Sequence, residues 1–64
     1  MKFTDMDMLQ DYEKDSRMAA VAYVLMATET LDPSLRSLFR TMADNAAESQ
    51  EKAANLILRK GDRP

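Results

Sequence analysis

The chain has 64 residues, no cysteine and no histidine, nine basic and eleven acidic residues, and a net charge of −2. This composition excludes disulfides and metal sites with thiolate or imidazole ligands, and it lacks the basic excess typical of proteins that bind nucleic acids. Chains this short form small cores and commonly need a metal or a partner chain for stability.

The N-terminal segment is acidic and lacks the apolar stretch of a secretory signal. The longest uncharged run, from Met18 to Thr28, is shorter than the roughly 20 residues that span a bilayer. We therefore predict a cytoplasmic protein that does not act at a membrane.

The first predicted helix covers residues 5–30. Thr4 or Asp5 can cap its first turn, and good helix formers follow without a glycine or proline. Along this helix, apolar and small residues recur in alternating steps of three and four, the pattern of packed helices. The predicted seam on this helix contains Leu9, Tyr12, Ser16, Ala19, Tyr23, Met26 and Thr30.

A turn is predicted at residues 31–32, because Asp32 is a good N-cap and Pro33 suits the first helical position. So short a connection favours antiparallel neighbours, an αα-hairpin, over one long helix with a proline kink.

The second predicted helix covers residues 33–60 and ends at Gly61, a suitable residue just beyond a helix. The tail at 62–64 is expected to fray. The seam on this helix contains Leu35, Phe39, Met42, Ala46, Ser49, Ala53 and Leu56. The two seams are predicted to pack against each other within the hairpin, and the charged opposite side of the second helix is predicted to be solvated.

A second apolar stripe, Met18, Val21, Val24 and Leu25, lies on the first helix away from its seam. One partner helix cannot cover both sides of a helix that is apolar all round, and a contiguous exposed patch is typical of an interface. We predict that two hairpins pair through these four residues into a four-helix bundle. The alternative is an ordinary surface, since single exposed apolar residues are common.

We predict no catalytic, cofactor-binding or metal-binding residue. Glu48 and Glu51 have the i, i+3 spacing of metal ligands but face outward, and Glu13 and Glu29 lie about 24 Å apart along a helix. All four are predicted to be solvated surface charges. Nucleophilic catalysis by a serine would need a base that the chain does not offer.

The segment Asp32–Gly61, "DPSLRSLFRTMADNAAESQEKAANLILRKG", preceded by "VAYVLMATET", resembles the ferritin-like helical hairpins. It is most similar to the small spore coat F-like proteins of endospore-forming bacteria, which share an Asn/Asp-Pro-x-Leu-Arg turn and a helix that ends in a basic pair and glycine. The resemblance implies a ferritin-like fold and a structural role in the spore coat. Where the wider superfamily has acidic residues and a histidine, this chain has Asn45, Ala46, Ala47 and Ser49, so iron chemistry is not carried over.

The sequence thus predicts an all-α protein, one antiparallel helical hairpin of residues 1–64 that homodimerises into a ferritin-like four-helix bundle. The predicted function is non-enzymatic, that of a structural or assembly protein in the cytoplasm, or in the spore coat if the resemblance holds. Its expected partners are a second copy and other proteins of an assembly. Two alternatives remain open: a metal-binding or oxidoreductase remnant that uses carboxylates only, and a small adaptor that binds a heterologous protein.

Overall fold

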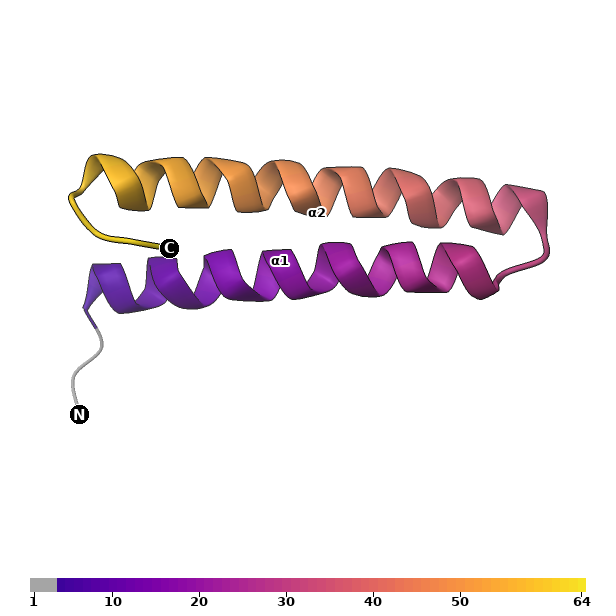
Figure 1. The fold of residues 1–64 in the computed structure, drawn as a ribbon, viewed down its shortest axis with the longest axis horizontal. Helices are drawn as coiled ribbons and strands as arrows, with labels where there is room; N and C mark the ends of the chain where they lie inside the picture. The colour runs from indigo at the N-terminus through magenta and orange to yellow at the C-terminus, as the bar shows by residue number, and fades with distance from the viewer. Residues whose placement is uncertain (1–3) are drawn as a thin grey trace.

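The computed structural model describes residues 4–64, which form two helices side by side (Figure 1). Helix α1 spans Asp5–Glu29 and helix α2 spans Pro33–Arg59. No strand occurs within the described range. The prediction of an all-α helical hairpin is therefore confirmed. The helix bounds lie within one residue of those expected, and residues 1–3 of the predicted domain lie outside the described residues.

Helix α1 begins with a reciprocal cap. The Thr4 hydroxyl accepts a hydrogen bond from the Asp7 backbone N–H, and the Asp7 carboxylate accepts one from the Thr4 N–H, both at 3.1 Å. These two bonds satisfy donors that the first turn of a helix leaves free. The negative charges of Asp5 and Asp7 also lie at the positive end of the helix dipole.

The turn between the helices is fixed by local hydrogen bonds. Oδ1 of Asp32 accepts from the backbone N–H groups of Ser34 and Leu35 at 2.8 and 3.3 Å, and proline occupies the first position of α2. Nε of Arg36 donates to the Thr30 carbonyl at 3.0 Å, which links the first turn of α2 to the end of α1. The chain therefore reverses direction with only three residues outside the helices.

The Asp32 cap can be tested separately from the packing of the helices. We expect Asp32→Ala to lower the free energy of unfolding by about 1 kcal/mol, because two N–H groups lose their acceptor. Chemical denaturation followed by circular dichroism would measure the change. Asp32→Asn keeps a capping oxygen and should stay close to wild type. Equal losses in both variants would show that the cap does not stabilise the turn.

Helix α2 ends in a Schellman motif. Gly61 has a φ of 86°, in the left-handed region that glycine adopts without strain. The Gly61 N–H donates to the Leu58 carbonyl at 3.0 Å and the Asp62 N–H to the Ile57 carbonyl at 3.1 Å. The tail then turns back between the two helices (Figure 1), where the Gln10 side-chain amide donates to the Arg63 carbonyl. The structure places the tail against α1, while residues 61–64 are all exposed; that this tail frays stays an expectation.

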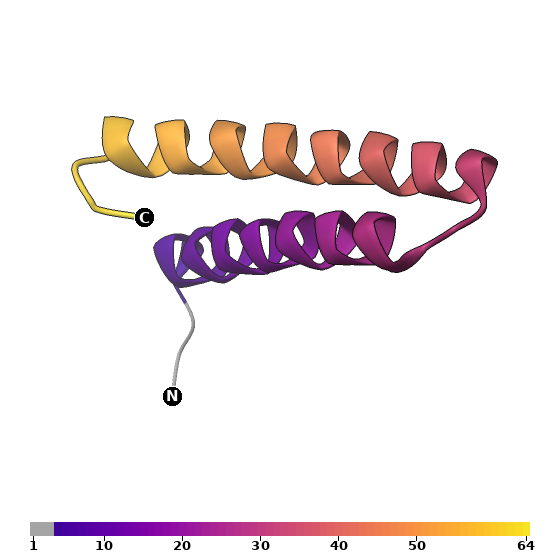
Figure 2. The same cartoon turned by 45° about the vertical axis from the view of Figure 1, so that its right-hand side comes forward.

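The hairpin is one layer of helices thick. Its Cα atoms extend over 44 × 25 × 12 Å, and the two helices lie side by side in both views (Figures 1 and 2). Only five of the described residues are buried: Glu13, Ala27, Ala43, Ala53 and Ile57. The core is therefore a thin line between two helices, with three alanines among its members.

Candidate protein-interaction surfaces

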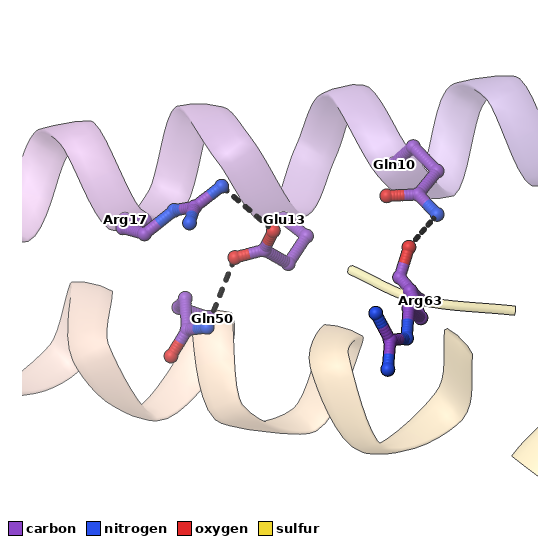
Figure 3. Close-up of polar contacts among 5 residues, drawn as sticks. All are labelled: Gln10, Glu13, Arg17, Gln50 and Arg63. Carbon is purple, nitrogen blue, oxygen red and sulfur yellow. Dashed lines mark hydrogen bonds and ion pairs between the residues drawn. The ribbon is translucent and has the colours of Figure 1, made fainter. Parts of the chain in front are cut away.

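A buried carboxylate lies in the contact between the helices (Figure 3). Glu13 is only 1% exposed, and its two oxygens have different partners. Oε1 accepts from Nη2 of Arg17 at 3.2 Å, and Oε2 accepts from Nε2 of Gln50 on α2 at 2.9 Å. The prediction that Glu13 is a solvated surface charge is wrong, because the register of α1 turns this residue toward α2, where an amide and a guanidinium satisfy it.

The buried residues between the helices include Glu13 and Ala27 of α1 and Ala43 and Ile57 of α2. Each of these residues directly follows a predicted seam residue. Four predicted seam residues are instead exposed: Tyr12 (55%), Met26 (44%), Leu35 (42%) and Leu56 (36%). The buried alanines allow the helices to approach closely, and these four predicted seam residues remain on the rim of the contact.

The other predicted seam residues lie nearer to the contact. Ala53 is buried, while the remaining ones are half-buried: Leu9, Ser16, Ala19, Tyr23, Thr30, Phe39, Met42, Ala46 and Ser49. The apolar seam is therefore wider than the contact that it makes inside one hairpin.

The seam residues that are not buried between the helices line a groove along one side of the hairpin. Its central part has a volume of about 420 Å³ and is lined by Tyr12, Asp15, Ser16, Ala19, Tyr23, Met42, Asn45, Ala46 and Ser49. A second hollow of about 410 Å³ shares Tyr12 and Ser49 with it and adds Leu9, Lys52, Ala53 and Leu56. We call the residues of these two hollows, together with Met26, the groove face. Met26 continues the line of Tyr12 and Ala19 at a spacing of seven residues.

The predicted interface residues lie on other sides of α1. Met18, Val21 and Leu25, each about 60% exposed, line a hollow of about 420 Å³ together with Lys14, Arg17 and Ala22. We call Met18, Val21 and Leu25 the outer stripe. Val24 is also exposed but lines a different hollow, with Ala27, Thr28, Arg36 and Arg40. The structure thus brings three of the four residues together, and their role as an interface stays a prediction.

The carboxylates of the described helices do not converge. Within residues 4–64, no three potential ligands among Asp and Glu come close enough to hold one metal ion. Glu29, Glu48 and Glu51 are exposed, and Glu48 pairs only with Lys52 at 3.7 Å. Neither α1 nor α2 has a stretch long and apolar enough to cross a membrane.

Two antiparallel helices with a thin shared core and exposed apolar residues on different sides define the class: a small all-α hairpin protein. The chain belongs to the Coat F domain family, whose pattern matches residues 4–63. The match includes α1, the turn, α2 and Gly61, so the resemblance to spore coat F-like proteins is confirmed and extends beyond the segment that carried it. No curated protein and no solved structure matches the chain.

Proposed function

We propose that this protein is a non-enzymatic structural component of the spore coat that acts through self-association. The observation that carries the proposal is the Coat F domain match over residues 4–63. A coat protein functions by contacts with other protein subunits. The exposed apolar residues of the hairpin provide surface for such contacts.

The outer stripe is one proposed contact between copies. Burial of apolar surface contributes roughly 25 cal/mol per Å², so three adjacent exposed aliphatic side chains favour association once a partner covers them. The charged residues beside the stripe are Lys14 and Arg17, and Arg17 is already paired with Glu13. Lys14 is a long, exposed side chain that can turn its ammonium group to solvent when the stripe is covered.

Light scattering on a sizing column, over a range of protein concentrations, tests the proposal. We expect a mass greater than the 7.3 kDa of one chain, with larger species at higher concentration. A folded monomer at every concentration would overturn the proposal. It would favour the adaptor alternative, in which the exposed stripe binds a different protein.

We expect Val21→Asp to lower the average mass at a given concentration while the helical circular dichroism stays unchanged. Val21 is 58% exposed, so a carboxylate there is solvated in the monomer but loses water without a partner in an assembly. Leu58→Asp, on α2 and 55% exposed, is the matched control and should keep the wild-type mass. An unchanged mass for Val21→Asp would remove the outer stripe from the proposal.

The carboxylate-only metal alternative gains no support from the geometry of the described residues. Its best-buried carboxylate, Glu13, already uses both oxygens in bonds to Arg17 and Gln50. The exposed carboxylates are spread along both helices. We therefore propose no metal site.

A further inference from the structure

The dimensions of the hairpin are those of one half of a larger folded unit. Its Cα radius of gyration is 14.2 Å, whereas about 11 Å is typical of a compact chain of this length and about 14 Å of one twice as long. Its accessible surface is 5037 Å², against about 4,200 Å² for a compact monomer of this mass. The excess, roughly 800–900 Å², is close to what each partner contributes to a standard protein interface.

On one side of the hairpin the helices carry more apolar positions than one neighbour requires. Two lines of residues at seven-residue spacing on each helix suffice for a pair of helices, whereas helices in the core of a bundle carry a third line. On α1 this third line is Tyr12, Ala19 and Met26. On α2 it is Leu35, Met42, Ser49 and Leu56. Residues of both lines meet in the groove, because the same hollow is lined by Tyr12 and Ala19 of α1 and Met42 of α2.

The side chains of the groove face differ in size in a way that suits packing against another helix. Small side chains from both helices, Ser16, Ala19, Ala46 and Ser49, lie along the groove. Large side chains, among them Tyr12 and Met42, stand beside them. Packed helices place large side chains of one helix into spaces between side chains of the next, so this alternation of sizes provides both.

We infer that the groove face binds the groove face of a second copy and that the two hairpins together form a four-helix bundle. Residues 4–64 supply two helices, and a second copy supplies the two that complete a four-helix bundle. A contact between identical surfaces closes at two copies. Asp15 on α1 and Lys52 on α2 lie on the same face, so a copy can present opposite charges to both.

This surface differs from the outer stripe in what it can build. The stripe lies on the side of α1 away from the groove, so pairing through it places α1 against α1 and leaves each α2 on the outside. Such a pair is a row of helices rather than a bundle. Association through the groove face closes the core, and the outer stripes then remain free to join one bundle to the next. The inference rests on the proposed self-association and assigns it to two separate surfaces.

Substitutions at two neighbouring residues of α1 can distinguish the two surfaces experimentally. Met26 belongs to the groove face and is 44% exposed, while Leu25 belongs to the outer stripe and is 58% exposed. We expect Met26→Glu to reduce the dimer to a folded monomer at micromolar concentration. We expect Leu25→Glu to keep the dimer and to lose only the larger species. Tyr12→Glu, where the two hollows of the groove face meet, should act as Met26→Glu does. Light scattering gives the mass, and circular dichroism checks that each variant keeps its helices.

Each outcome has a distinct meaning. Monomers from both groove variants beside a dimer from Leu25→Glu support the inference. A monomer from Leu25→Glu with a dimer from Met26→Glu overturns it but leaves the proposed self-association intact. If all three variants are monomeric, or all three dimeric, the assignment to the groove face is also wrong. A wild-type chain that is monomeric at every concentration overturns both the inference and the proposed function.

Discussion

Replacement of Ile57 by aspartate should unfold the hairpin. Ile57 is 0% exposed and is the largest apolar side chain among the buried residues, whose other apolar members are alanines. Its backbone carbonyl also accepts the hydrogen bond from Asp62 that closes the Schellman turn. A carboxylate buried at this position without a partner costs several kcal/mol. A single core in a chain this small rarely supplies more than about 3–5 kcal/mol.

Circular dichroism measures this result directly. We expect Ile57→Asp to lose most of its helical signal at 25 °C, whereas the neighbouring Leu58→Asp changes the unfolding free energy by less than about 0.5 kcal/mol, because Leu58 is 55% exposed. Ile57→Ala should give an intermediate loss of about 2–5 kcal/mol. All samples must be compared at one protein concentration, since association adds to apparent stability. A cooperative wild-type melt from Ile57→Asp would show that the core does not depend on this residue.

The second large effect concerns Gln50, whose replacement by leucine should destabilise the hairpin although it adds an apolar side chain to the contact. Among residues 4–64, the Gln50 amide is the only donor to Oε2 of Glu13, and Glu13 is almost fully buried. Loss of a hydrogen bond to a buried charged group costs about 1.5–3 kcal/mol. Arg17 cannot compensate, because it already donates to the other oxygen.

The double variant Glu13→Leu/Gln50→Leu should reverse the sign of the effect. Replacement of a whole buried polar set by apolar side chains of similar volume is often neutral or stabilises by about 1–4 kcal/mol. Arg17, whose side chain is 57% exposed, remains solvated without its partner. Denaturant titration of the single and double variants gives both values. Glu48→Leu, in an exposed pair with Lys52, is the control and should change little. A double variant less stable than Gln50→Leu would show that the buried carboxylate is itself stabilising.

Local signals in the sequence were sufficient to predict the two helices and the residues at which they begin and end. Asp32 followed by Pro33 located the turn, and Gly61 marked the end of α2, because each of these residues favours a particular backbone geometry independently of its tertiary contacts. The same signals missed the path of the tail. Its contact with Gln10 joins residues 53 positions apart, and short-range patterns carry no information on such a pair.

It was harder to predict which side of each helix faces the other. Both helices carry an apolar band three positions wide, and alternating steps of three and four fit either edge of that band. Hydrophobicity favoured the edge with Tyr12 and Met26. Close approach instead favoured the edge with Ala27 and Ala43, and a buried glutamate such as Glu13 is rare enough for a sequence to suggest a surface position. Which edge a single hairpin uses is set by side-chain size as well as by hydrophobicity.

The C-terminal tail has a consequence for how the hairpin opens. Two helices joined only by a turn separate most easily at their free ends, and such local opening exposes backbone amides to hydrogen exchange and to proteases. In this chain the free ends are linked, because the Gln10 side chain of α1 donates to the Arg63 carbonyl beyond α2 (Figure 3). Separation of the helices at this end therefore also breaks the bond to the tail, which adds about 0.5–1.5 kcal/mol to the free energy of opening there. Part of the resistance to fraying at the open end thus comes from a residue that belongs to neither helix.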